Sequence, residues 1–296
     1  VGQPRVQFTT TRETRDYVSY ANRFLRWGGG RFQDMIAHDA DFDPYYAAIY
    51  WRFLYEQCGG MQEGVEDPAA GMAIVRRALT VLYSGEIVDV DSSTDTVGAT
   101  PEILDRALAG SSCPFQTYQE SLVTFARAVY GLRVDGGRCV EPGLPAGCGL
   151  YDPHHLYGAP PVETVTFDGA AREVKRDLLS PSGMDWIDIL FAPAAEGKSL
   201  TLEFRAPPAT GAEPNVQILH LADAYGSAGP QHHLVPPAAT EACEQRRQDG
   251  LLVCVIPEIH SAVYNRLGLI ITNLDGQEAP DSMRQYTLAL HPSAVP

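Results

Sequence analysis

The sequence predicts a helical domain followed by an antiparallel β-sandwich in one chain of 296 residues. Up to about residue 135, apolar residues recur with the period of an α-helix, and from Val162 they alternate with the period of a β-strand. Residues 136–161 between the two are rich in Gly and Pro. We therefore expect a helical domain at 1–135, a disulfide-tied Gly/Pro-rich linker at 136–161 and a β-sandwich domain at 162–296.

Residues 43–60, which read DPYYAAIYWRFLYEQCGG, predict the helix around which the first domain is organised. Asp43 is a favourable N-cap, and the proline that follows it fits the first helical position. Two glycines end the stretch. Because its apolar and aromatic side chains cover every face, we expect other elements to surround it and Trp51 and Phe53 to be largely buried. Arg52 and Glu56 are the charged residues inside it, and they lie one turn apart, as a structural ion pair or as functional groups.

Four further helices are predicted by start signals and by apolar residues in steps of three and four. They begin at about Thr11, after Asp67-Pro68, after Thr100-Pro101 and at about Gln116, the last one reaching Leu132.

The second half contains eight strand-like runs separated by turn residues. They are residues 162–167, 172–179, 185–191, 199–206, 215–222, 251–257, 266–274 and 284–291. No helical pattern lies between them, so we expect antiparallel pairing, and a two-layer sandwich is the architecture that buries one face of each strand.

The six cysteines form an even set, which is typical of an oxidising compartment. One pair brackets a Gly/Pro-rich loop and another a polar turn, which leaves the remaining two for each other. The expected bonds are Cys139–Cys148, Cys243–Cys254 and Cys58–Cys113. The alternative is a cytosolic protein with six buried thiols.

Charge and hydropathy exclude some partners. The net charge is −15 and neither half is basic, so nucleic acid and anionic membranes are poor candidates. No run approaches the ~18 apolar residues of a membrane helix. The chain begins at Val1 and not at Met, which suggests a processed product.

Motifs for metal-dependent or nucleophilic catalysis are incomplete in this sequence. HExxH, GxSxG, the P-loop and GxGxxG are all absent, and no two histidines stand four apart on a predicted helix. His154-His155 and His232-His233 are adjacent pairs in predicted Pro/Gly-rich loops, where neighbouring side chains point apart unless the backbone bends. A metal role for them stays open, but we expect no cofactor.

Residues 89–95, DVDSSTD, resemble the start of a calcium loop through Asp89, Asp91 and Asp95. An EF-hand needs glycine and glutamate where this chain has Thr94 and Thr100, so an EF-hand is excluded. A looser calcium site and a solvated acidic loop both remain open.

Two resemblances add to this interpretation. Residues 185–291, with DWIDILF, SLTLEF, NVQILHL, RLGLIITNLDG and YTLALHP, resemble the bacterial pre-peptidase C-terminal type of β-sandwich. Residues 10–132 resemble the helical lobe that follows the zinc-binding helix in secreted gluzincin metallopeptidases. The second resemblance implies that Glu13 is a third zinc ligand, although the HExxH pair is missing. Glu13 as a surface charge is the alternative.

These resemblances imply the non-catalytic C-terminal portion of a secreted peptidase-like protein, extracellular or at the cell surface. Its helical lobe would be a scaffold and its sandwich an accessory module for a protein or extracellular-matrix partner. The alternative is a structural or adhesive surface protein that assembles with copies of itself.

Overall fold

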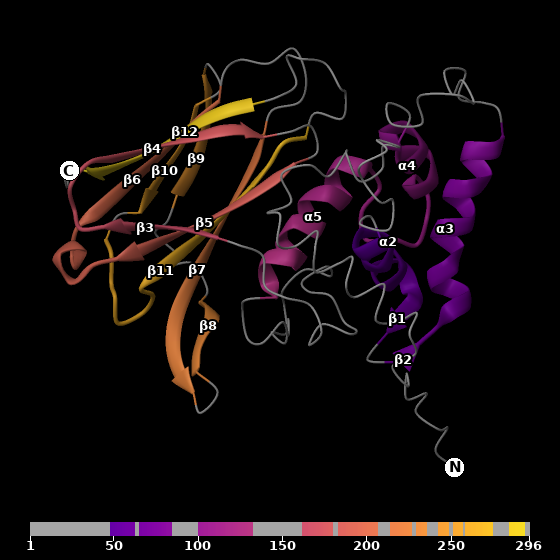
Figure 1. Cartoon of the computed structure of the whole chain (residues 1–296), viewed down its shortest axis with the longest axis horizontal. Helices are drawn as coiled ribbons and strands as arrows, with labels where there is room; N and C mark the ends of the chain where they lie inside the picture. Colours follow the sequence, from indigo (N-terminus) through magenta and orange to yellow (C-terminus); the bar gives the residue numbers. More distant parts are fainter. Residues whose placement is uncertain are drawn as a thin grey trace.

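In a computed structural model of the chain, the fold is a helical part followed by two packed β-sheets (Figure 1). The described residues are 48–62, 65–84, 100–132, 162–179, 183–206, 214–226, 229–235, 242–248, 251–256, 258–274 and 284–293. Within them, the predicted combination of helical domain and β-sandwich is confirmed. The predicted helix from Thr11, the start of the next helix at Asp43 and the linker at 136–161 lie outside the described residues.

Four α-helices build the described helical part. They are α2 (Ala48–Tyr55), α3 (Pro68–Tyr83), α4 (Thr100–Leu108) and α5 (Tyr118–Gly131). As expected, α2 is the centre of this part, with Tyr50, Phe53 and Leu54 fully buried. Trp51 is partly buried and packs against the same core.

The central helix ends in a kinked turn at Glu56–Gly60. Cys58 and Gly59 leave the helical conformation there, and Gly59 has φ 111°, a conformation that glycine adopts readily. Two short strands follow, β1 (Met61–Gln62) and β2 (Val65–Glu66), which pair with each other.

Two helix starts follow from local sequence. The Asp67 carboxylate accepts hydrogen bonds from the backbone N–H groups of Ala69 and Ala70, which confirms the start of α3 predicted from Asp-Pro. Helix α5 begins behind Thr117, whose side chain forms a capping box with Glu120. This start is two residues later than predicted, and the Thr-x-x-Glu spacing is the signal that marks it.

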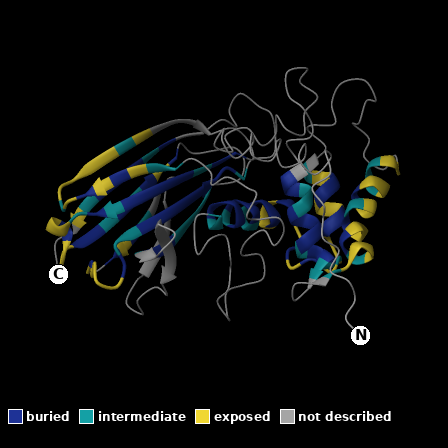
Figure 2. Cartoon of the chain, turned by 60° about the horizontal axis from the view of Figure 1, so that its bottom comes forward, coloured by how far each residue is buried: buried dark blue, intermediate teal, exposed yellow. Residues whose placement is uncertain are grey.

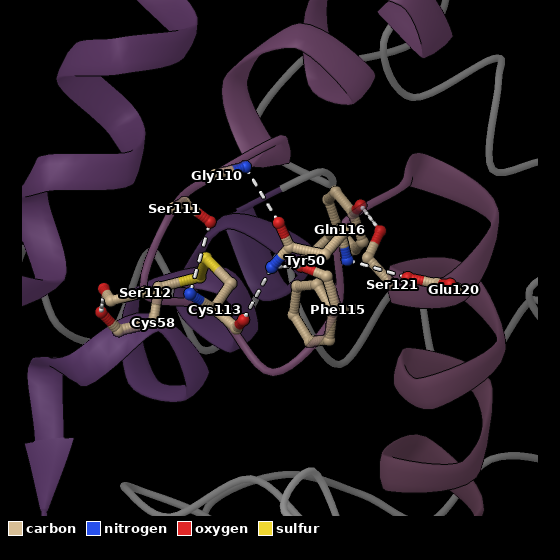
Figure 3. Close-up of a disulfide and its surroundings, with 10 residues drawn as sticks. All are labelled: Tyr50, Cys58, Gly110, Ser111, Ser112, Cys113, Phe115, Gln116, Glu120 and Ser121. Carbon is tan, nitrogen blue, oxygen red and sulfur yellow. Dashed lines mark hydrogen bonds between the residues drawn. A yellow bond between two sulfur atoms is a disulfide. The ribbon is translucent and has the colours of Figure 1, made fainter.

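A disulfide joins the end of the central helix to the segment before α5. Cys58 bonds to Cys113, 55 residues later, which is the pair expected from the sequence (Figure 3). Nearby, the Ser112 hydroxyl donates to the Cys58 carbonyl, and the Gln116 amide donates to the Cys113 carbonyl. A loop of this length corresponds to about 4 kcal/mol of stabilisation if the bond acts by restricting the unfolded chain.

The other two predicted disulfides stay predictions. Cys139 and Cys148 lie outside the described residues. In the antiparallel pairing of their strands, Cys243 stands directly opposite Cys254, which is buried between the sheets. The Cys243–Cys254 bond stays a prediction.

The sandwich consists of two five-stranded sheets. One has the order β4-β12-β6-β10-β9 and the other β3-β5-β11-β7-β8. Their bounds are β3 Glu163–Phe167, β4 Arg172–Leu179, β5 Met184–Phe191, β6 Ser199–Arg205, β7 Asn215–Gly226, β8 Gly229–Val235, β9 Ala242–Gln248, β10 Leu251–Ile256, β11 Arg266–Thr272 and β12 Arg284–Ser293.

All described neighbours in the sandwich pair antiparallel except β3 and β5, which pair in parallel. The intervening strand β4 belongs to the opposite sheet, so the chain crosses the sandwich twice and returns in its original direction.

Strands β8 and β9 were not predicted from the sequence. Their sequences, GPQHHLV and ACEQRRQ, lack apolar alternation, because each pairs on one side only and stands last in its sheet as described. The placement of His232-His233 in a loop is therefore wrong. Both belong to β8, where His232 stands opposite Asp223 and His233 opposite Ala222.

Apolar side chains fall into two clusters, and one of them crosses the boundary between the two parts. Buried positions lie both in the helices and along the strands of the sandwich (Figure 2). The first cluster fills the space between the sheets. The second contains the helical core together with five residues of the outer face of the β3–β5–β11–β7–β8 sheet, namely Met184, Trp186, Leu219, Leu221 and Ile270. Helix α5 covers that face (Figure 1). None of the described helices is both long and apolar enough to span a membrane.

Candidate functional site between the last helix and the sandwich

A network of charged and polar side chains lies where α5 meets the sheet. It contains Tyr130 of α5, Asp188 of β5, Arg266 of β11 and Asp223 of β7. Strand register explains the meeting: residues 188 and 266 point to the α5 side of the sheet, the same side as Trp186 and Ile270.

Asp188 is the centre of this network. It is fully buried, and its carboxylate oxygens have different partners. The Tyr130 hydroxyl donates to Oδ1 at 2.7 Å, and the Arg266 guanidinium donates to Oδ2. The second terminal nitrogen of Arg266 reaches Asp223 Oδ2 at 3.2 Å. A buried carboxylate is stable only when its charge is paired in this way.

The charge of Arg266 is stabilised by its neighbours. Burial opposes the charged form, but the hydrogen bonds and negative charges of Asp188 and Asp223 outweigh it and raise the pKa of Arg266 above its ordinary value. Asp223 is itself held by a hydrogen bond from its backbone N–H to the Asn265 side chain. The network therefore fastens α5 to three adjacent strands.

Close backbone packing accompanies the network. A Cβ atom at position 268 would lie 2.2 Å from the Tyr130 hydroxyl oxygen, so Gly268 is the residue that lets the tyrosine reach Asp188. Beside it, the Trp186 indole N–H donates to the Ala126 carbonyl, and the Gln217 amide donates to the Val123 carbonyl. Three hydrogen bonds thus connect α5 to β5 and β7.

The ion pair predicted inside the central helix forms a second polar cluster. Arg52 Nε donates to Glu56 at 2.7 Å, and a terminal nitrogen of Arg52 lies 3.3 Å from Glu66. Glu56 is buried, and Tyr55 donates its hydroxyl to Glu66. Burial, and then the hydrogen bond and charge of Glu66, raise the pKa of Tyr55 to about 12. These contacts match the structural interpretation of the Arg52–Glu56 pair.

A buried histidine lies on the inner face of the same sheet. His220 of β7 is 6% exposed and packs edge-on against the Tyr264 ring, with 4.8 Å between ring centroids. Burial lowers the pKa of His220 from 6.5 to about 4, so this imidazole is neutral at physiological pH.

The remaining site residues suggested by the sequence lie outside the described residues. These are Glu13, the acidic loop with Asp89, Asp91 and Asp95, and the pair His154-His155. In the part of the chain that is described, no three His, Cys, Asp or Glu side chains are grouped as a metal site would need. The network around Asp188 was missed at the sequence level. Its signal was Asp188, on the same face of its strand as Met184 and Trp186, and an arginine at the start of another strand.

Comparisons with known proteins identify no family. No protein-family model matches the chain, and no curated protein matches it in sequence.

Solved structures give weak likenesses. PliG of Aeromonas hydrophila, a periplasmic inhibitor of g-type lysozyme, has 13% identity and a TM-score of 0.24, covering 45% of this chain and 97% of PliG. CorA, a surface-associated copper-binding protein of Methylomicrobium album BG8, has 11% identity and a TM-score of 0.15, covering 45% and 81%. The GH115 glucuronidase BtGH115A has 9% identity and a TM-score of 0.19, covering 85% and 38%. Scores this low imply neither a shared fold nor a function.

Proposed function

We propose that this chain is the non-catalytic C-terminal portion of a secreted peptidase-like protein. In this proposal the helical part is a scaffold, and the sandwich is an accessory module that binds a protein or extracellular-matrix partner. The observation that carries this proposal is that the buried carboxylates form ion pairs within the fold. Asp188 and Glu56 are both buried, and each bonds to an arginine of the same fold, so their charge holds elements together.

An extracellular or cell-surface location is part of the proposal. The Cys58–Cys113 disulfide supports it, because disulfides persist in oxidising compartments and are rare in the cytosol.

The surface available for a partner is the outer face of the β4–β12–β6–β10–β9 sheet. Its strands present Glu173, Lys175, Arg205 and Val255 as exposed side chains. Exposed charged side chains of both signs are compatible with the polar rim of a protein–protein contact.

Metal content and peptidase activity test the proposal. We expect purified protein to contain well under one equivalent of zinc by elemental analysis and to cleave casein no faster than a chelator-treated blank. A catalytic zinc needs about three protein ligands and an open position for water. Stoichiometric zinc with chelator-sensitive proteolysis would contradict the proposal and direct attention to His154, His155, His232 and His233.

A second candidate is a structural or adhesive surface protein, and the same exposed sheet face favours it. Regular lattices or filaments of purified protein in electron micrographs would support this candidate over the accessory module.

A further inference from the structure

The outer side of α3 carries an unusual concentration of exposed apolar residues. The large apolar side chains exposed in the described part of the chain are Met72, Leu79, Tyr83, Val255 and Val263. Three of these five belong to α3, the helix farthest from the sandwich (Figure 1), with exposed fractions of 38%, 47% and 81% in sequence order. Single exposed apolar residues are ordinary, but a cluster of them marks an interaction surface.

These residues lie on one stripe of the helix. Positions 72, 76, 79 and 83 are separated by four, three and four residues, so at 3.6 residues per turn they fall within an arc of about 60°. The stripe therefore consists of Met72, Arg76, Leu79 and Tyr83. The helix that carries it lies at the outer edge of the helical part and has many exposed positions (Figure 2).

The opposite side of α3 is what holds the helix in the fold. Gly71, Ile74 and Ala78 are buried there. A Cβ atom at Gly71 would come within 2.5 Å of the Tyr55 ring, which shows how closely α3 approaches the central helix. Since this packing does not involve the stripe, the exposed apolar residues are not part of the core.

The charge of α3 differs in sign from that of the chain. The helix contains two arginines and no Asp or Glu, whereas the whole chain has a net charge of −15. Arg77 donates to the Ala109 carbonyl behind α4, so it is directed toward its own fold. Arg76 lies in the stripe. The surface is thus apolar along its length with a positive charge near its middle.

We propose that this stripe is the docking surface for an amphipathic helix of a partner protein that carries Asp or Glu beside its apolar residues. An apolar stripe with spacing of this kind matches the way helices pack against one another. An acidic side chain of the partner would pair with Arg76 at the centre of the contact. The inference goes beyond the proposed function, because it assigns a surface on the helical part whatever the sandwich binds.

Charge argues against a second copy of α3 as the occupant. If two copies packed antiparallel about a two-fold axis at the middle of the stripe, residue 76 of each copy would lie opposite residue 79 of the other. The two Arg76 side chains would then lie close together with no acidic residue on either helix. Arg76 would attract an anionic membrane as it attracts an acidic helix, so vesicle binding in the experiment distinguishes these two occupants.

The test uses two synthetic peptides, each kept helical and monomeric by a side-chain staple. Both carry Leu at the apolar positions, and one has Glu on its flanks where the other has Lys. Fluorescence anisotropy with the full chain should show the acidic peptide binding about tenfold more tightly, and less tightly as salt is raised. Arg76→Glu should reverse this preference. Equal binding of the two peptides would overturn the proposal.

Substitutions locate the surface. Leu79→Glu should weaken binding of the acidic peptide about tenfold, as should Tyr83→Ser, because each removes apolar contact from the stripe. Val263→Glu is the matched control, since Val263 is similarly exposed at 52% but lies in the sandwich. A loss of binding in the control alone would contradict the assignment. So would a Leu79-dependent dimer in sedimentation, or Leu79-dependent binding to phosphatidylglycerol vesicles.

Discussion

The two sheets of the sandwich differ in how many of their faces are buried. In the β3–β5–β11–β7–β8 sheet, β11 is buried at almost every position, because the second sheet covers one face and α5 covers the other. In the second sheet, β6 alternates between buried apolar and partly exposed polar residues. The helical part is therefore a third layer of the sandwich, placed on one side only.

The amino-acid sequences of the strands reflect this difference in burial. RLGLIIT is nearly continuous in apolar character, as is usual for strands covered on both faces, whereas SLTLEFR alternates. An antiparallel strand without alternation therefore indicates a covering layer elsewhere in the chain.

The shared apolar cluster also bears on the division into domains at 1–135 and 162–296, which stays a prediction. A fragment of residues 162–296 would expose Trp186 and Ile270.

The largest effect should follow from removing the main apolar contact between the layers. Trp186→Ala is expected to lower the free energy of unfolding by ~3–5 kcal/mol, because a fully buried indole is replaced by a cavity. The measurement is denaturation by urea. The control is Glu203→Ala on the exposed face of the other sheet, for which a change within ~0.5 kcal/mol is expected. Equal losses of unfolding free energy in the two variants would mean that the outer faces of the two sheets contribute equally to stability.

Removing the hydroxyl of the network should have an intermediate effect. Tyr130→Phe deletes the hydrogen bond to the buried Asp188 carboxylate, and bonds to charged groups contribute ~1.5–3 kcal/mol. A double-mutant cycle with Asp188→Asn would show whether the two side chains are coupled. Additive effects would contradict a direct role of this bond in holding α5 on the sheet.

The smallest of these effects is a pH dependence from the inner face of the same sheet. The folded-state pKa of His220 is about 4 and the unfolded value is 6.5, so the unfolded chain binds the proton first. The stabilising contribution of neutral His220 is thus present above pH 6.5 and is lost as the pH falls toward 4. At pH 5.5 the expected loss is about 1.4 kcal/mol.

The comparison with His220→Leu isolates this contribution, because carboxylates elsewhere titrate equally in both proteins. Unfolding free energies measured between pH 7 and pH 5 should fall more steeply in the parent protein than in the variant. Identical slopes would show that His220 does not take up a proton on unfolding.

Local signals in the sequence predicted the fold better than they predicted the polar contacts. The capping by Asp67 and the alternation of apolar residues within a strand such as β6 involve residues that are close in sequence. The start of α3 and eight of the strands could therefore be predicted. The Arg52–Glu56 pair was also recognised, since its members are one helical turn apart. Asp188 and Tyr130 are separated by 58 residues, and their meeting depends on where α5 lies over the sheet.

Gly268 has a consequence for how the strands align. Sliding β11 by one residue along its neighbours would turn Arg266 into the space between the sheets and bring Leu267 or Leu269 beneath the Tyr130 ring, and sliding it by two would bring Arg266 or Ile270 there. Only the observed alignment presents hydrogen in place of a side chain at that point. The absence of a side chain at position 268 thus selects a single register for β5, β11 and β7. Helix α5 can pack on the sheet only when the strands are in that register.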